Sequence, residues 1–479
     1  MSFKLPNHKT KIVCTIGPAS RSRAMLKRLM RTGMNVARIN LSHGTLKQHR
    51  EDIRRIRSLS RELNSTVTIL ADLPGPKIRV GKLNDEPIEL RKGSLVTLAT
   101  KGASDNPSVI PVDFKRLPES VSRGSKIYLN DGFIQLRVKG VEDQDVICKV
   151  IIGGKLLSHK GLNLPGAELD VDAVTEKDLD LMDFCLGEDI DAVSVSFAKS
   201  AADILKVKNF AASKGKSIYA VAKIERKEAV DNIDEILKVA DAVMVARGDL
   251  GVEIPIEKVP LVQKMLISKA NIMGRPVITA TQMLESMTAN IRPTRAEVTD
   301  VANAILDGTD AVMLSEETAI GDYPVETLRM MVRIAAATER HRRQLGRRVT
   351  LQDHIQGTKA NRKVEDVIAA SLIEALNMLD VRLILTPSHS GTTPRLVSRF
   401  KPVCWVLAFS DSIEVCNFLA LSYGVHPVFM EERSDILNKA IRFIKNKKLV
   451  KRGDQVLLTE GLLPGRVGGT DTVRIITVD

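Results

Sequence analysis

The chain has 479 residues, of which 44% are hydrophobic and 27% charged; this excludes a wholly disordered or fibrous protein and predicts about three domains. It has no apolar stretch near the ~20 residues of a membrane-spanning helix and no apolar signal-peptide core in its first residues, so we expect a soluble, cytoplasmic protein that binds no membrane. The net charge is +13 but only 3% of residues are aromatic, which leaves little for stacking on bases and favours phosphate esters over nucleic acid.

The first 72 residues alternate strand and helix patterns. Short β-rich runs cover residues 11–15, 36–41 and 66–71, and segments with helical spacing separate them. This alternation is typical of βαβ units, which build a parallel sheet.

The pattern changes after the turn Pro74-Gly75-Pro76. Up to about Pro165 the chain has short alternating strands, such as 95–98, 126–129 and 146–152, and no long amphipathic helix. We interpret this part as a small all-β domain inserted into the α/β fold.

Beyond Thr175 the βα alternation resumes. Further strands are predicted at 192–196, 217–224, 242–246, 277–280 and 311–314. With the first three they make eight parallel strands, the number in a closed (β/α)8 barrel.

After a basic linker that begins at Arg340, the chain is again α/β. Strands are predicted at 382–386, 403–407, 425–429 and 455–459, with helices between them. This order predicts an open, doubly wound domain.

The cysteines are widely spaced and form no C-x-x-C pair. Neither a structural zinc site nor a disulfide framework is indicated, and we expect buried, reduced thiols. They are Cys14, Cys148, Cys185, Cys404 and Cys416.

Catalytic groups in such barrels lie at the C-terminal ends of the strands. Arg38, Asn40 and Ser42 are spaced by two at the end of the second strand, so they share one face. The other polar strand ends are Asp72, Lys223–Glu225, 247–251, 279–282 and 315–318. Their convergence on one rim predicts the site.

Glu225 and Asp249 are carboxylates on neighbouring strand ends. Mg²⁺ is usually held by one or two carboxylates, with waters and substrate oxygens completing its shell. The alternative is that these carboxylates form ion pairs with Lys223 and Arg247. In the metal interpretation, Lys223 and Arg38 supply the fixed positive charge that phosphoryl transfer needs.

Two further polar residues have two interpretations each. The Thr281 hydroxyl can bond a substrate carboxylate or a proton-relay water, or be satisfied by backbone. His43 can act as a general base, or bond backbone or a ligand phosphate. Gly248 and Gly251, on either side of Asp249, permit close approach of backbone to an anion.

Long segments of the sequence resemble the pyruvate kinase family, in the same order and over essentially the whole chain. They are 11–17, 35–44, 72–79, 222–226, 244–253, 279–287, 293–304 and 307–319. The resemblance, to a bacterial-type member, implies transfer of a phosphoryl group from phosphoenolpyruvate to ADP, which gives pyruvate and ATP. It also implies a homotetramer and three domains. These are a catalytic barrel (1–73 and 163–345), a β-barrel lid (74–162) and an effector-binding α/β domain (346–479).

The resemblance also implies roles for the rim residues. Glu225 and Asp249 match Mg²⁺ ligands, for which Mn²⁺ can substitute. Lys223 matches the lysine that stabilises the transferring phosphoryl group and the enolate, and Thr281 a threonine near the proton path. The substrate-binding positions are Arg38, Lys223, Ala246, Arg247, Gly248, Asp249 and Thr281.

Other matching positions lie near the nucleotide and the lid. Asp131 matches the place where the lid approaches the barrel, and lid closure would exclude water from the phosphoryl group. Asn130 and Glu316 depart from the residues common in the family, and nothing in the sequence explains them. The nucleotide positions are Thr15, Pro18, Asn40, His43, Arg79 and Lys160.

The family's monovalent-cation site matches Asn40, Ser42, Asp72 and the Leu73 carbonyl. However, the potassium-dependent branch usually has glutamate where this chain has Lys77. A lysine ammonium can supply the positive charge that K⁺ supplies elsewhere, so we expect that activity does not require K⁺.

The C-terminal region has a hydroxyl-rich loop between a strand and the start of a helix. Hydroxyls, a glycine and helix amides suit an oxyanion, although an ordinary polar turn has the same composition. The resemblance implies a sugar phosphate or AMP as effector here, with 459–471 as the partner loop. The effector candidates are Thr386, Ser388, Ser390, Gly391, Thr392, Thr393, Arg466 and Gly468.

Two other functions fit parts of the sequence. Another Mg²⁺-dependent barrel enzyme acting on phosphoenolpyruvate or pyruvate, of aldol type, would use the same carboxylates. It would need neither the lid nor the nucleotide-side residues Thr15, Pro18, Arg79 and Lys160. A non-enzymatic or nucleic-acid-binding role has only the net charge of +13 in its support.

Overall fold

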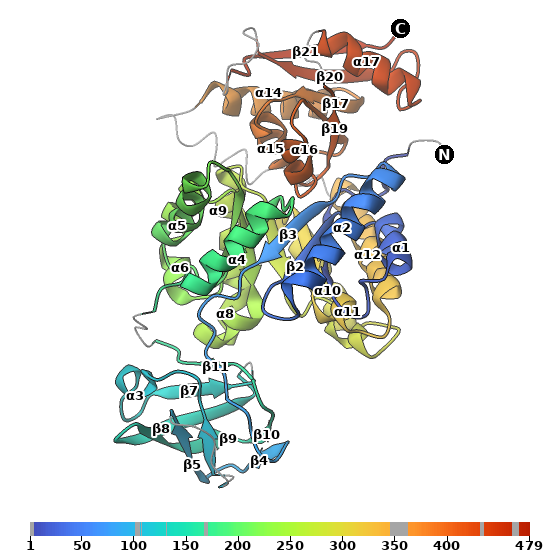
Figure 1. Ribbon diagram of the computed structural model, residues 1–479. Coiled ribbons are helices and arrows are strands. Elements are labelled where there is room, and N and C mark those ends of the chain that lie inside the picture. The colour runs from blue at the N-terminus through green and yellow to red at the C-terminus, as the bar shows by residue number, and fades with distance from the viewer. Residues whose placement is uncertain are drawn as a thin grey trace.

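The computed structural model describes residues 4–100, 106, 108–130, 132–166, 171–344, 363–431, 435–461 and 469–479. Three parts follow one another along a line, with a barrel in the middle, a β-sheet domain at one end and the C-terminal α/β region at the other (Figure 1). Of the residues singled out above, Asp131, Arg466 and Gly468 lie outside the described residues.

The barrel consists of eight parallel strands in the closed order β1-β16-β15-β14-β13-β12-β3-β2, which confirms the predicted fold class. Each strand overlaps one of the eight predicted from the sequence. Their bounds are β1 Lys11–Ile16, β2 Val36–Asn40, β3 Thr68–Asp72, β12 Ala192–Val195, β13 Tyr219–Ile224, β14 Ala242–Ala246, β15 Val277–Ala280 and β16 Ala311–Leu314.

Helices cover the outside of the barrel, and several begin at a capping residue. The Thr45 and Thr294 side chains accept bonds from the backbone N–H groups of Gln48 and Glu297, whose own side chains bond back to the cap. The bounds are α1 Arg23–Thr32, α2 Leu46–Leu63, α4 Glu176–Gly187, α5 Ala201–Ser213, α6 Lys227–Asp231, α7 Ile233–Val239, α8 Arg247–Glu253, η1 Ile256–Lys258, α9 Val259–Ile272, η2 Glu285–Thr288, α10 Arg295–Asp307, α11 Glu316–Ala319 and α12 Pro324–Gln344.

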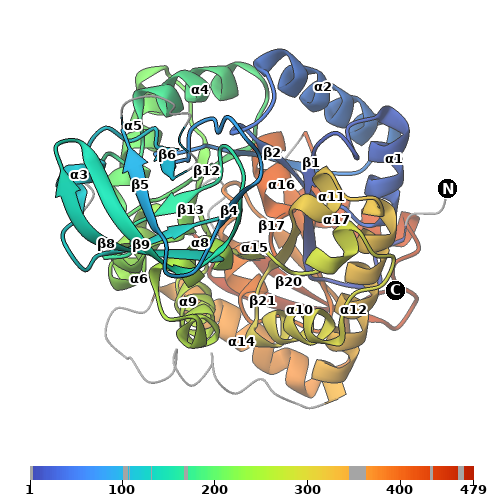
Figure 2. The ribbon, with the colours of Figure 1, turned by 90° about the horizontal axis from the view of Figure 1, so that it is seen from below.

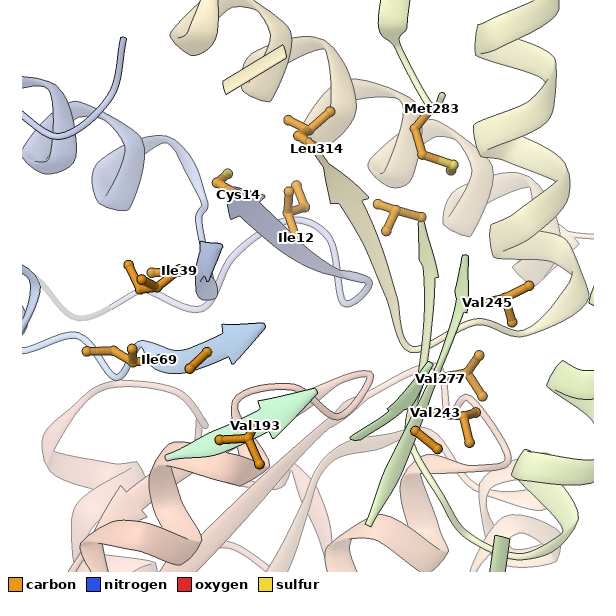
Figure 3. Packing of buried hydrophobic residues seen from close by; sticks show 14 of the residues in the cluster. Ile12, Cys14, Ile39, Ile69, Val193, Val243, Val245, Val277, Met283 and Leu314 are labelled. Atoms are coloured by element: carbon orange, nitrogen blue, oxygen red, sulfur yellow. The ribbon is translucent and has the colours of Figure 1, made fainter. Parts of the chain in front are cut away.

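The alternation of side chains along each strand separates two cores. Ile12, Cys14 and Ile39 point outward to the helices (Figure 3), whereas Val13 and Val36 fill the barrel interior. Because successive side chains of a strand face opposite sides, the inward positions near the strand ends form the floor of a site. Burial of the outward side chains anchors the helices to the barrel.

The inserted domain follows β3 and curls around its own apolar core. Its six-stranded sheet has the order β11-β7-β8-β9-β5-β6, and a second sheet pairs β10 with β4. Residues 79 and 80 bridge to Gly161 and Val112, beside the two edge strands, and so join the edges. The bounds are β4 Ile88–Leu90, β5 Leu95–Ala99, β6 Val109–Pro111, α3 Leu117–Ser120, β7 Lys126–Leu129, β8 Ile134–Glu142, β9 Asp145–Ile152, β10 Gly154–Leu156 and β11 Leu162–Asn163.

The C-terminal region is a five-stranded sheet with the order β19-β18-β17-β20-β21. Helices α14, α15 and α16 pack on one face and α17 on the other, as expected for a doubly wound domain. The antiparallel edge strand β21 was not predicted. The bounds are α14 Val364–Met378, β17 Val381–Pro387, α15 Thr392–Ser398, β18 Trp405–Ser410, α16 Ile413–Leu419, β19 Val425–Phe429, α17 Ile436–Asn446, β20 Gln455–Glu460 and β21 Thr472–Thr477.

The C-terminal region closes the barrel at the N-terminal ends of its strands. Phe418 and Leu421 belong to the same core as Val13 and Val36 inside the barrel. The Lys11 ammonium, at the start of β1, donates to the Val425 carbonyl at 2.7 Å. The opposite mouth, at the C-terminal ends of the strands, therefore faces the inserted domain, which lies over one side of it in the view from below (Figure 2).

The state of the cysteines and the character of the helices were both predicted from composition. All five cysteines are buried and none is in a disulfide, as predicted. No helix in the described part of the chain combines the length and the apolar character that a membrane crossing requires.

Candidate active site

Asp72, the last residue of β3, is the centre of a charged cluster at the rim. Its carboxylate accepts bonds from Arg38 Nε at 3.0 Å and from the Ser194 hydroxyl at 2.6 Å, and it pairs with Arg38 Nη2 as well. Burial by itself would raise the pKa of Asp72, but the nearby charges of Lys223 and Arg38 lower it to about 2. Asp72 is therefore ionised and holds two cations at the rim.

Lys223 lies between two carboxylates. Its ammonium is 2.8 Å from Glu225 Oε1 and 3.4 Å from Asp72 Oδ1, and it donates to the Ser196 hydroxyl at 2.7 Å. Burial disfavours the charged ammonium, but the two carboxylates raise its pKa above the usual value. The site thus contains a buried lysine that stays protonated and has little freedom to move.

Glu225 is almost completely buried. Its Oε2 accepts a bond from the Phe197 backbone N–H at 2.8 Å. Burial raises the pKa of Glu225, Lys223 lowers it, and the neighbouring charge of Asp249 raises it again. Two carboxylates close enough to repel one another are a place where a cation is favoured.

Asp249, on α8, pairs with Lys77, whose ammonium lies 3.4 Å from Asp249 Oδ1. The ion-pair alternative from the sequence is therefore correct for Glu225 with Lys223. It is wrong for Asp249 with Arg247, because the Arg247 guanidinium pairs with Asp300 at 2.7 Å instead.

The donor set at this rim fits Mg²⁺. The described residues contain no group of three or more His, Cys, Asp or Glu side chains that could hold a metal alone. Mg²⁺ needs only one or two carboxylates when substrate oxygens and waters fill its octahedron. Glu225 and Asp249 provide those two carboxylates, and their mutual repulsion would be relieved by a divalent cation.

Thr281 follows β15 and has a left-handed backbone, with φ +64°. Its hydroxyl accepts from the Gly248 backbone N–H at 2.9 Å and donates to the Ala280 carbonyl at 2.7 Å. The backbone-satisfied alternative therefore describes Thr281 in this structure. The same bonds hold the hydroxyl beside the main chain of residues 246–248.

The nucleotide-side positions of the barrel lie next to the charged cluster. The Thr15 hydroxyl accepts from Arg38 Nη1 at 2.9 Å and donates to the Leu314 carbonyl at 3.0 Å. Pro18 is exposed on the loop that follows. That loop packs closely on α11, because a Cβ at Gly17 would come within 2.5 Å of the Ala319 carbonyl oxygen.

His43 is exposed after β2. Partial desolvation of the ring, and then the cations Arg79, Arg38 and Lys77, lower the pKa of His43 below the ordinary value. The side chain is therefore neutral at pH 7 and near several positive charges. Such surroundings do not produce a strong base, and they suit a group that bonds an anionic ligand.

Two of the nucleotide positions belong to the inserted domain. Arg79 Nη1 donates to the His159 carbonyl at 3.0 Å, and the Val80 N–H donates to the Lys160 carbonyl at 2.9 Å. Arg79 and Lys160 are thus on neighbouring segments at the junction with the barrel. Nearby, a Cβ at Gly132 would lie 3.5 Å from Val252 of α8, so this turn of the inserted domain approaches the rim.

The positions matched to a monovalent-cation site also lie together. Asn40 and Asp72 are register partners on β2 and β3. The Asn40 side-chain oxygen accepts from the Ser42 N–H at 3.1 Å, and the Leu73 carbonyl accepts from the Ser196 hydroxyl at 2.6 Å.

The hydroxyl-rich loop lies between β17 and α15, as expected. The Ser390 and Thr392 hydroxyls are 2.9 Å apart, and Ser388 Oγ accepts from the Gly391 N–H at 3.0 Å. Gly391 has φ +71°, and a Cβ there would come within 3.1 Å of Val415 on α16. Thr386 is buried under the loop, and the Thr393 hydroxyl is 2.6 Å from that of Thr470.

Three residues of the site, Ser194, Ser196 and Glu317, had no individual role predicted from the sequence. Ser194 and Ser196 bond Asp72 and Lys223, and the same period-two spacing that identified Arg38 and Asn40 could have found them. Glu317 is buried beside the turn after β15. The signal for Glu317 was its place in the polar strand end 315–318, to which no individual role was assigned.

Comparisons with known proteins agree over nearly the whole length. The family model described as pyruvate kinase, barrel domain, matches residues 7–328, and the model described as pyruvate kinase, alpha/beta domain, matches residues 366–476. A protein named pyruvate kinase from Thermococcus litoralis is 51% identical over 476 residues, which cover 99% of this chain and 100% of the relative. Pyruvate kinases from Geobacillus stearothermophilus and Staphylococcus saprophyticus are 43% and 42% identical, over 98% of this chain and 80% of each relative.

Proposed function

This chain belongs to the pyruvate kinase family, a family of phosphotransferases, and on that premise we propose that its barrel rim transfers the phosphoryl group of phosphoenolpyruvate to ADP. The products are pyruvate and ATP. The observation that carries the proposal is the buried Lys223 ammonium, held 2.8 Å from Glu225 and 3.4 Å from Asp72 at the C-terminal mouth of the barrel.

Lys223 and Arg38 are proposed to stabilise the charge on the transferring group. Phosphoryl transfer spreads negative charge over three equatorial oxygens, so catalysis depends on positive charges that are already in position. Asp72 forms ion pairs with both cations and so restricts their motion before the substrate binds. Lys223 is also proposed to stabilise the negative charge that develops on the enolate oxygen.

Glu225 and Asp249 are proposed to hold Mg²⁺, with Mn²⁺ as a substitute. When bound, the cation would polarise substrate oxygens and neutralise developing charge. The site needs such a charge: among Arg38, Lys77, Lys223 and the three rim carboxylates, positive and negative side chains are equal in number. Without the cation, these six side chains would exert no net electrostatic attraction on an anionic substrate.

The main chain of residues 246–248 is proposed to surround the substrate carboxylate. Thr281 lies beside it, with its hydroxyl bonded to Gly248 N–H at 2.9 Å. We assign Thr281 to the path by which the enolate is protonated, through water rather than by a side-chain acid.

The nucleotide is proposed to bind between the barrel and the inserted lid. Thr15, Pro18, Asn40 and His43 lie on the barrel side, and Arg79 and Lys160 on the lid side. We keep the predicted boundaries for the barrel (1–73 and 163–345), the lid (74–162) and the C-terminal domain (346–479). Closure of the lid, to which the resemblance assigns Asp131, would exclude water from the phosphoryl group.

Activity without K⁺ is proposed because Lys77 occupies the rim. Its ammonium, 3.4 Å from Asp249, brings positive charge to the rim where the substrate phosphate is proposed to bind. The oxygens of Asn40 and Leu73 at the monovalent-cation positions already accept protein hydrogen bonds.

The loop 386–394 is proposed to bind a sugar phosphate or AMP as effector. Its hydroxyls and the N–H groups at the start of α15 are suitable donors to phosphate oxygens. We also propose a homotetramer in the cytoplasm. This proposal rests on the family to which the chain belongs.

The test is steady-state formation of pyruvate from phosphoenolpyruvate and ADP with Mg²⁺, for wild type, Lys223→Met and the matched control Lys227→Met. Lys227 is an exposed lysine on α6 whose ammonium lies 2.6 Å from Asp231. We expect Lys223→Met to lower kcat by about 100-fold or more, and Lys227→Met to retain activity. Absence of turnover in wild type, with and without K⁺ and sugar phosphates, would contradict the proposal and favour the aldol-type or non-enzymatic alternatives.

A further inference from the structure

We propose that Arg247 is a positioning residue, whose guanidinium holds the turn that carries Thr281 and so aims the Thr281 hydroxyl at the rim. Arg247 was expected at the substrate through its backbone, but its side chain is turned away from the site and is only 11% exposed. The inference rests on the proposed function, because it assigns to Arg247 a role through a residue of that site.

The turn after β15 has a backbone that needs external support. Thr281 has φ +64° and Gln282 has φ +54°, so two consecutive non-glycine residues are left-handed. This conformation is unfavourable for side-chain-bearing residues, and above all for β-branched threonine. Such a pair persists only where the surroundings hold it.

Arg247 provides that support by bonding consecutive groups of the turn. Its Nε donates to the Ala280 carbonyl at 3.2 Å and its Nη2 to the Thr281 carbonyl at 2.7 Å. Nη2 also lies 2.8 Å from the sulfur of Met283. A planar guanidinium offers these donors in a fixed fork, which the single ammonium of lysine cannot reproduce.

The guanidinium is itself held from the other side. Its Nη1 bonds Asp300 on α10 at 2.7 Å, and Gln263 on α9 lies 3.4 Å from the same nitrogen. The charge of Arg247 is thus compensated by Asp300 and not by a rim carboxylate. A substrate anion would have to break this pair to reach Arg247, so direct substrate contact by the side chain is disfavoured.

Glu317 holds the far end of the same turn. Its buried carboxylate accepts from the Leu284 N–H at 3.2 Å and from the Ser315 N–H at 2.6 Å. The turn is therefore bonded at its carbonyls by Arg247 and at an N–H by Glu317. Between these supports, the Thr281 hydroxyl donates to the Ala280 carbonyl, the same oxygen that Arg247 Nε bonds.

A double-mutant cycle tests whether Arg247 acts through the Thr281 hydroxyl. Arg247→Lys keeps the charge but loses the fork, and we expect kcat to fall by about tenfold or more while the KM for ADP is unchanged. In a Thr281→Ala background, where no hydroxyl remains to be aimed, Arg247→Lys should change kcat by less than about twofold. In a Thr281→Ser background, which keeps a hydroxyl, the loss should reappear.

Arg275→Lys is the matched control. Arg275 also bonds two consecutive carbonyls, those of Leu237 at 3.1 Å and Lys238 at 3.2 Å, but away from the rim. Arg275→Lys should leave kcat within about twofold of wild type. That result would show that kcat depends on the orientation of the Thr281 hydroxyl and not on the mere loss of arginine–carbonyl hydrogen bonds. A wild-type kcat in Arg247→Lys would overturn the inference. So would a fall in kcat caused by Arg247→Lys that is as large in the Thr281→Ala background as in wild type.

A crystal structure of Arg247→Lys separates this inference from the proposed function. We expect the backbone at Thr281 and Gln282 to leave the left-handed region once the fork is lost. An unchanged turn would overturn the inference even in an enzyme that makes pyruvate. A relaxed turn would support it even if wild type made none, in which case only the proposed function would fail.

Discussion

Asp72 shows how one buried carboxylate organises the rim. It pairs with Arg38 and Lys223, and their charges keep its pKa near 2 despite burial. Removing either cation from such a cluster would leave a buried charge uncompensated, which is costly. The arrangement keeps both cations in place before the substrate binds, as electrostatic catalysis requires.

Lys77 leads to a prediction about monovalent cations. We expect turnover of wild type to change by less than about twofold when K⁺ replaces tetramethylammonium at constant ionic strength, because the Lys77 ammonium, 3.4 Å from Asp249, already supplies positive charge at the rim. In Lys77→Glu, which removes that charge and adds a carboxylate beside Asp249, K⁺ should raise turnover by about tenfold or more. The measurement is kcat against K⁺ concentration for both proteins. A steep response of wild type to K⁺ would show that Lys77 does not replace the cation.

Individual side chains were predictable where strand alternation fixes their direction. Arg38 and Lys223 face the site because they have the inward parity of their strands, and Ser194 could have been found by the same rule. Arg247 could not, because it begins a helix, where parity no longer applies. Its spacing from Asp249 suggested an ion pair, but its side chain turns to α10, which only the packing of the helices decides.

At the scale of elements, α16 closes the bottom of the barrel. Phe418 near its end stacks on Tyr219 at the start of β13, with ring centroids 3.9 Å apart and planes 7° from parallel. The Thr68 hydroxyl donates to the Asn417 carbonyl, and the Asn417 amide donates to Asp191 at 2.8 Å. This helix of the C-terminal region thus completes the core of the barrel.

The contribution of α16 can be measured by truncating its buried ring. Phe418→Ala should lower the free energy of unfolding by about 3–5 kcal/mol, because it removes the ring and leaves a cavity. The measurement is a denaturant titration followed by fluorescence and circular dichroism. Ile413→Ala, in the same helix but 48% exposed, is the control and should change stability by about 0.5 kcal/mol or less. Equal effects of the two substitutions would show that the ring does not stabilise the barrel.

The eight barrel strands, which were predicted, differ in burial from the edge strand β21, which was not. The barrel strands are largely buried, with one face toward the helices and the other toward the barrel interior, and most of their residues are apolar, which is visible in the sequence. Strand β21 is an edge strand whose residues are mostly exposed or half-buried, so its sequence lacks such a run. Its pairing with β20 across the intervening segment depends on contacts that are distant in sequence.

At the scale of the whole molecule, the two ends of the barrel are covered by different domains. The inserted domain lies at the mouth formed by the C-terminal ends of the strands, and the C-terminal region fills the opposite mouth (Figure 1). Gly391 of the proposed effector loop packs on Val415 and Leu419 of α16, whose Phe418 enters the barrel core. An effector that moved this loop would therefore act on the element that closes the barrel.

The destination of the phosphoryl group tests the central claim most directly. Phosphorus-31 NMR would follow an equimolar mixture of phosphoenolpyruvate and ADP with Mg²⁺ and the full-length enzyme. We predict that the phosphoenolpyruvate signal is replaced by the γ-phosphate of ATP in equal amount, without free phosphate. Release of inorganic phosphate without ATP, which would mean hydrolysis of phosphoenolpyruvate, or an unchanged spectrum would contradict the account.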